Sequence, residues 1–123
     1  MSAGDFKERK ALETWMRGIV AAFQSQTRLD LSGWELTYLP DVIGELKSLT
    51  LLDLDNNELS TLPESIGQMS SLIDLDLRGN KLSSLPESIG NLTSLQTLWL
   101  DENQISLLPE ALFELESLQN LHL

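Results

Sequence analysis

The sequence has 123 residues, no cysteine, and 19 acidic against eight basic side chains, which gives a formal net charge of −11. A chain of this length forms one domain, and its acidity disfavours nucleic acid and anionic membranes as partners. Without cysteine it has neither a disulfide framework nor a thiolate zinc site, and it contains no apolar run of membrane-spanning length. These features predict a soluble protein in a reducing, cytoplasmic compartment.

Residues 1–25 predict an amphipathic helix. One apolar stripe with helical spacing is formed by Leu12, Trp15, Met16, Ile19, Val20 and Phe23. Ser2 and Asp5 resemble a capping box, and Gly4 favours a helix start near them. We expect this helix to cap the structure that follows, with a partner-binding or membrane-surface helix as the alternative.

A 23-residue repeat fills positions 26–123. Its copies occupy 26–48, 49–71, 72–94 and 95–117, and a partial copy occupies 118–123. The clearest copy, LIDLDLRGNKLSSLPESIGNLTS, spans residues 72–94. The positions that recur in register are Leu72, Leu75, Leu77, Asn80, Leu82, Leu85, Pro86, Ile89, Gly90 and Leu92. Because one such coil cannot bury its own leucines, the repeat predicts a solenoid of stacked coils.

Each copy predicts a strand, a turn and a return segment. Apolar and polar residues alternate at 75–77, which is typical of a short strand with its leucines inward, and the strands form a parallel concave sheet. The turn asparagines Asn57, Asn80 and Asn103 are expected to bond backbone groups that the bend leaves unpaired. Pro86 begins a convex 3₁₀ or helical turn that has an acidic residue at its start and Gly90 at its end.

Two coils depart from the repeat. In the first, Trp34 replaces the turn asparagine, and we expect its indole to pack on the N-terminal helix near Trp15 or Phe23. Tyr38 is expected either to contact the same helix or to remain exposed. In the fourth coil Phe113 replaces the glycine, which predicts a slightly longer convex helix.

The frame L-x-x-L-x-L-x-x-N-x-L-x-x-L-P-x-x-I-G-x-L-x-x of residues 72–94 resembles the 23-residue intracellular class of leucine-rich repeats. That class includes Ras-pathway scaffold proteins, plant intracellular Ras-group-related proteins, the arrays of Roco proteins and many small bacterial repeat proteins. The resemblance covers residues 26–123. It implies an α/β solenoid that acts as a protein–protein interaction module or adaptor, in the cytoplasm or, alternatively, delivered as a secreted bacterial effector.

The variable strand positions are the candidate binding residues, because the recurring positions build the core. Stacking aligns residues that are 23 positions apart, so three rows cross the expected sheet. The first row is Arg28, Leu51, Asp74, Thr97 and Asn120; the second is Asp30, Asp53, Asp76, Trp99 and His122; the third is Ser32, Asp55, Arg78 and Asp101. Strands lie about 4.8 Å apart, so the aspartates are like-charged neighbours, and Arg28 and Arg78 are expected to offset part of their repulsion.

A recognition surface for a basic protein partner, anchored by Trp99, is the function that this face predicts. One alternative is a solvated acidic face on a purely structural fragment of a longer array. Another is Ca²⁺ binding by Asp53, Asp55, Asp74 and Asp76, although an open sheet offers few of the six or more oxygens that calcium requires. We expect no cofactor and no enzymatic activity, since His122, the single histidine, has no serine or cysteine nucleophile arranged with it.

Leu118, Leu121 and Leu123 begin a fifth strand without a return segment behind it. An uncovered coil exposes its leucines and an unpaired strand edge, which favours association. The sequence therefore predicts either a fragment of a longer array or a homo-oligomer formed through the C-terminal coil.

Overall fold

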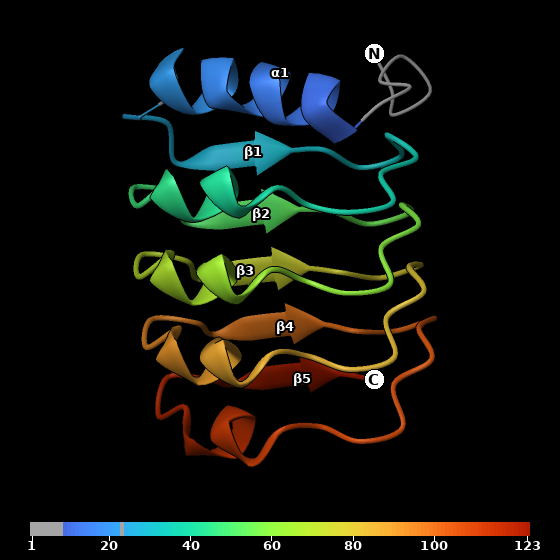
Figure 1. The fold of residues 1–123 in the computed structure, drawn as a ribbon. Helices are drawn as coiled ribbons and strands as arrows, with labels where there is room; N and C mark the ends of the chain where they lie inside the picture. Colours follow the sequence, from blue (N-terminus) through green and yellow to red (C-terminus); the bar gives the residue numbers. More distant parts are fainter. Residues whose placement is uncertain (1–8, 23) are drawn as a thin grey trace.

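A computed structural model describes residues 9–22 and 24–123, which form a helix followed by stacked coils (Figure 1). The helix is α1 (Arg9–Ala22). The strands are β1 (Arg28–Asp30), β2 (Leu51–Asp53), β3 (Asp74–Asp76), β4 (Thr97–Trp99) and β5 (Asn120–His122). The 3₁₀ turns are η2 (Asp41–Glu45), η3 (Glu64–Gln68), η4 (Glu87–Asn91) and η5 (Glu110–Glu114). Within these described ranges, no helix has the length and apolar character needed to cross a membrane.

The five strands form one parallel sheet in the order β1-β2-β3-β4-β5, which confirms the predicted solenoid. Each strand pairs with the next at an offset of 23 residues, as Leu52 with Leu75 and Leu75 with Leu98 illustrate. The strands occupy one side of the coils and the 3₁₀ turns the other (Figure 1). Residues of one repeat position therefore stand side by side across the sheet.

The leucines of every coil join one continuous core that begins under the helix. Leu12, Met16 and Val20 of α1 are buried with it, and Leu115 lies at its far end. Leu52, Leu75 and Leu98, at the centres of their strands, expose no surface. Burial of such side chains stabilises a fold by about 1.5–3 kcal/mol each, so stacking rather than any single coil carries the stability.

The turn asparagines connect consecutive coils. The buried Asn80 donates from Nδ2 to the carbonyl oxygens of Leu54 and Leu77, at 3.0 Å each, and its Oδ1 accepts the backbone N–H of Leu59 at 3.0 Å. Asn57 and Asn103 make the corresponding bonds in their own coils. One side chain thus pairs backbone groups of two coils that would otherwise be buried without partners.

Helix α1 lies over the first coil and contacts it through aromatic side chains. The ring centroids of Trp15 and Trp34 are 4.9 Å apart, so Trp34 packs on the helix as predicted. The Tyr38 hydroxyl donates to the carbonyl oxygen of Arg9 at 2.7 Å, and the Arg9 guanidinium lies 3.7 Å from the tyrosine ring. The predicted helix start at Ser2, Gly4 and Asp5, like the stripe residue Phe23, lies outside the described residues.

The glycines of convex turns η2, η3 and η4 have a role that differs from the predicted one. Gly90 lies inside η4, and the residue that ends this turn is Leu92. A Cβ built on Gly90 would stand 2.6 Å from Cβ of Ala111 in the next coil, and a Cβ on Gly67 would stand 2.5 Å from the Ser88 carbonyl oxygen. These glycines therefore permit the close approach of neighbouring convex turns rather than ending a helix.

The expectation of a longer convex helix at Phe113 is wrong. Turn η5 has five residues, as do η2, η3 and η4. Phe113 takes the place of Gly90 but is 67% exposed, because its side chain has no following convex turn against it among the described residues. Loss of the glycine changes what can stack on this turn and leaves its length unchanged.

Candidate functional site

Three carboxylates gather at the centre of the concave sheet. Oxygens of Asp53, Asp55 and Asp76 all lie within 4.8 Å of one another. Asp53 and Asp76 face each other across β2 and β3, and Asp55 follows the end of β2. The parallel register places them together, since it aligns the same repeat position in neighbouring coils.

Arg78 neutralises one member of this cluster. Its Nη2 lies 2.6 Å from Oδ2 of Asp76, and its Nε donates to Oδ1 at 3.0 Å. Asp76 is 8% exposed beneath the guanidinium, so it is not the solvated side chain that strand alternation predicts. The hydrogen bonds to Asp76, with the charges of Asp55 and Asp101 added, raise the pKa of Arg78.

Among the residues that the structure describes, no cation forms an ion pair with Asp53 or Asp55. Burial, followed by a side-chain hydrogen bond to Asp55 and repulsion from Asp55 and Asp76, raises the pKa of Asp53 to about 7. The backbone N–H of Asp55 donates to Oδ1 of Asp53 at 3.1 Å and offsets only part of this effect. The pair therefore holds a proton near neutral pH, where an isolated aspartate would have lost it.

Trp99 lies beside the carboxylates and is held from three directions. Its Nε1 donates to Oδ1 of Asp74 at 3.1 Å. The His122 ring stacks on it with centroids 3.9 Å apart and planes 7° apart, and the Arg78 guanidinium lies 4.6 Å from its centroid. Trp99 is half-buried, so it is part of a fixed stack and not the free exposed anchor that its sequence position suggests.

The remaining predicted residues surround this centre. Asp30 accepts hydrogen bonds from Oγ and the backbone N–H of Ser32, and these bonds lower its pKa. Arg28 is exposed, and among the described residues it forms no ion pair with the aspartates. The other candidates, Leu51, Thr97 and Asp101, lie half-buried on the same face.

The cluster meets only part of the requirements of a calcium site. Asp53, Asp55 and Asp76 supply carboxylate oxygens, whereas Asp74, which the sequence adds to this group, is engaged by the Trp99 indole. Asp76 already bonds Arg78 through both oxygens. Calcium takes six to eight oxygens, so three carboxylates on an open sheet would need several water ligands.

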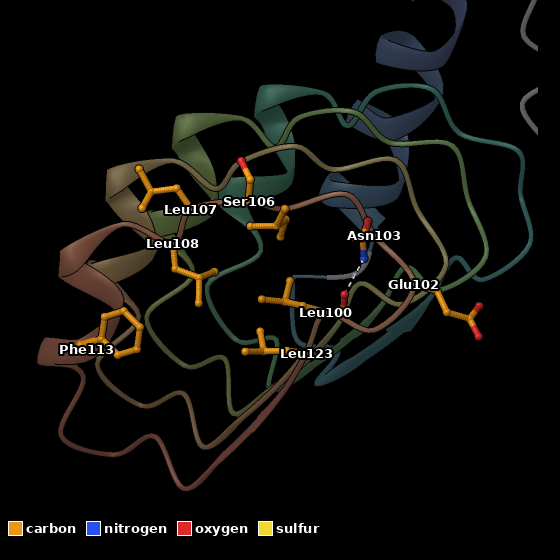
Figure 2. Close-up of a pocket in the computed structure, with 9 residues that line it drawn as sticks. Leu100, Glu102, Asn103, Ser106, Leu107, Leu108, Phe113 and Leu123 are labelled. Atoms are coloured by element: carbon orange, nitrogen blue, oxygen red, sulfur yellow. Dashed lines mark hydrogen bonds between the residues drawn. The ribbon is translucent and has the colours of Figure 1, made fainter.

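A second surface lies at the C-terminal end of the solenoid, and none of the predicted binding residues belongs to it. An apolar groove of about 430 Å³ opens there, with Leu107, Phe113 and Leu123 exposed by 79%, 67% and 72% (Figure 2). Leu107 and Phe113 stand where the preceding coil has Ser84 and Gly90. The sequence signal for it was Phe113 at a position where the earlier coils have Gly44, Gly67 and Gly90, together with Leu107 where the two preceding coils have Thr61 and Ser84.

Comparison with known proteins places this architecture in a family. A family model for the leucine rich repeat matches residues 25–82, and a model for two leucine rich repeats matches residues 70–113. The chain is a leucine-rich repeat protein. Leucine-rich repeat domains generally mediate protein–protein interactions and are typically non-enzymatic.

Two solved structures illustrate the similarity. A leucine-rich repeat protein of Leptospira interrogans is 42% identical, with a TM-score of 0.80 over 82% of this chain and 26% of its own. InlP of Listeria monocytogenes is 38% identical, with a TM-score of 0.62 over 71% of this chain and 24% of its own. The leucine-rich repeat chain described here thus spans about a quarter of either relative. No curated protein has a matching sequence.

Proposed function

We propose that this leucine-rich repeat protein is a non-enzymatic interaction module whose concave face binds a basic segment of a protein partner. The carboxylates of Asp53 and Asp55 would receive a lysine or arginine side chain. The observation that supports the proposal is three carboxylates within 4.8 Å of one another, of which one, Asp76, is paired with the Arg78 guanidinium. Such a cluster lowers its electrostatic energy by taking up a second cation.

The proton that Asp53 holds near neutral pH supports the same conclusion. The pKa of Asp53 is raised to about 7, so the free protein relieves the repulsion by binding a proton. A guanidinium from a partner would relieve the same repulsion and would also form two hydrogen bonds in one plane. Binding of a basic segment should therefore displace this proton.

The stack beside the carboxylates supplies the apolar part of the surface. Trp99 is fixed by Asp74 and His122, so it would lose little side-chain freedom on binding. Rigid aromatic side chains next to charged groups are typical of the residues that dominate binding energy. We therefore retain Trp99 as part of the proposed interface, as a fixed wall rather than an inserted anchor.

Calorimetric titration of a short oligoarginine peptide tests the proposal. Titrations near pH 7 in two buffers with different heats of ionisation measure the protons released on binding. We expect the wild-type protein to release a fraction of a proton for each peptide bound. The Asp53→Asn variant should release none, because asparagine keeps the shape of the side chain and removes the titrating group. Affinity should fall in Asp53→Asn and Asp55→Asn.

The matched control is Glu87→Gln, which makes the same change of charge on the exposed convex turn η4. It should leave both affinity and proton release unchanged. Equal weakening by Glu87→Gln would mean that the peptide responds only to overall charge and would refute the concave site. Titration of Ca²⁺ under the same conditions addresses the alternative: tight calcium binding that Asp55→Asn abolishes would favour a metal site.

A further inference from the structure

We propose that the cavity between helix α1 and the first coil binds a free aromatic amino acid, with its ring beside two tryptophans and its charged groups at Arg28 and Asp30. The cavity has a volume of about 210 Å³. It lies at the N-terminal end of the sheet, where α1 runs alongside β1 (Figure 1). None of its lining residues belongs to the carboxylate cluster on which the proposed function rests.

The inner part of the cavity is apolar. Trp15 and Ile19 come from α1, and Leu29, Trp34 and Leu49 come from the first coil. The ring centroids of the two tryptophans are 4.9 Å apart and their planes are tilted by 39°, so the two indoles together form one wall. An apolar cavity of about 150 Å³ can hold benzene, whereas drug-sized ligands occupy about 300 Å³ or more. The volume of this cavity therefore suits a single aromatic ring with a short substituent.

The polar lining residues lie at the mouth of the cavity. Gln26, Arg28 and Asp30 are exposed, whereas the apolar lining residues are half-buried or buried. Arg28 forms no ion pair among the described residues. Both hydrogen bonds from Ser32 go to Oδ1 of Asp30, and its Oδ2 accepts none from the described part of the chain. One cation and one anion with free bonding capacity therefore stand at the same opening.

The spacing of these two charges favours a zwitterion. Arg28 and Asp30 are the first and last residues of β1, so their side chains leave the same face of the strand from Cα atoms about 6.7 Å apart. An amino acid carries its carboxylate and its ammonium on one carbon, and it can reach both residues at once. A carboxylate alone would be repelled by Asp30, and an amine alone would be repelled by Arg28.

The apolar lining also distinguishes between aromatic amino acids. The described side chains of the inner lining offer no hydrogen-bond acceptor, because an indole N–H only donates. The hydroxyl of a bound tyrosine would therefore lose its bonds to water without finding a side-chain acceptor, which costs free energy. We expect phenylalanine to bind more tightly than tyrosine.

Titration of L-phenylalanine into the isotope-labelled full chain, followed by two-dimensional NMR, tests the proposal. The three tryptophans give three indole N–H signals, and Trp99 of β4 does not line the cavity. We expect the signals of Trp15 and Trp34 to shift along one saturation curve while the Trp99 signal stays in place. The comparison ligands each lack or add one feature: 3-phenylpropionate, phenethylamine, glycine and L-tyrosine. Each should bind more weakly than L-phenylalanine.

Three variants separate the ring from the charged groups. Arg28→Gln and Asp30→Asn each remove one charge and should weaken binding by about two- to fivefold, as expected for exposed charge pairs. Ile19→Phe fills the cavity from α1 and should weaken binding at least about tenfold, with circular dichroism as the check on folding. The matched control is Arg17→Gln, because Arg17 is exposed on α1 and does not line the cavity. It should leave the affinity unchanged.

The expected result is a saturable shift of the two cavity tryptophans, strongest affinity for L-phenylalanine and loss of binding in Ile19→Phe. No saturable shift, or a shift that persists unchanged in folded Ile19→Phe, would overturn the proposal. Equal affinity for 3-phenylpropionate or phenethylamine would refute recognition of a zwitterion. Asp53→Asn should leave phenylalanine binding unchanged, so this cavity and the concave face are tested independently.

Discussion

The side-chain amide of Asn80 donates to the carbonyl oxygen of Leu54, 26 residues earlier, across 3.0 Å. The same amide also bonds the carbonyl oxygen of Leu77 in its own coil, and its oxygen accepts the N–H of Leu59. One buried side chain therefore fixes the separation of two coils and satisfies three backbone groups.

We expect Asn80→Ala to lower the free energy of unfolding by about 1–3 kcal/mol, because it leaves buried backbone groups unpaired. Chemical denaturation measures the change. Asn91→Ala is the control, since Asn91 is exposed at the end of η4 and should change stability little. A near-neutral Asn80→Ala would contradict our account of the turn.

Replacing glycine with alanine should change the free energy of unfolding in opposite directions at Gly67 and at Gly18. At Gly67 the new Cβ would meet the Ser88 carbonyl oxygen at 2.5 Å, so we expect a loss of about 1–3 kcal/mol from overpacking. A Cβ built on Gly18 in α1 would meet no described atom within 4 Å outside its own helix backbone and chain neighbours, so alanine should stabilise the helix by about 0.5–1 kcal/mol. Thermal melting of both variants tests the contrast; two changes of the same sign would contradict it.

Glu102 adopts a left-handed backbone conformation with φ of 59°. The preceding coil has Gly79, with φ of 67°, at the same repeat position. We expect Glu102→Gly to raise the free energy of unfolding by roughly 0.5–1 kcal/mol, because glycine adopts this conformation without steric cost. Glu102→Ala removes the same charge but keeps the Cβ, and it should give no comparable gain by chemical denaturation.

Asp53 should make the protein less stable as pH rises, which is the opposite of the usual effect of an aspartate. Its pKa is about 7 in the folded chain and 3.8 for an unperturbed aspartate, so the folded state binds more protons between these values. Stability from this proton is present below about pH 4 and is lost as pH rises through about 7. Denaturation at pH 5 and pH 8 should show a decrease that Asp53→Asn reduces. An unchanged difference in Asp53→Asn would exclude Asp53 as its source.

The repeat allowed the fold and the alignment of the rows to be predicted. Spacing alone places Asp53 beside Asp76 and Trp99 beside His122, because parallel coils of equal length pair equal positions. Aromatic substitution at a turn asparagine was also enough to predict that Trp34 contacts the helix. These features depend on periodicity, which a sequence displays directly.

The burial and the protonation of the site residues depend on side-chain contacts that the repeat period does not specify. The burial of Asp76 results from the way Arg78 folds back over it, two residues along the chain. The raised pKa of Asp53 results from burial and from the position of Asp55. The function of Gly90 depends on the distance to Ala111 in the next coil, which its own turn does not reveal. Side-chain conformation and coil separation were the missing information.

Because consecutive strands from β1 to β5 all pair at an offset of 23 residues, a gene segment that encodes one whole coil can be duplicated or lost in frame. A duplicate of residues 72–94 would bring its own asparagine, glycine and serine, and so would satisfy both of its neighbours. Each such event would lengthen the concave face by about 4.8 Å. The first coil has Trp34 in place of the asparagine, and the fourth has Ala111 and Phe113 in place of the serine and glycine, so a duplicate of either coil would bring only part of these contacts.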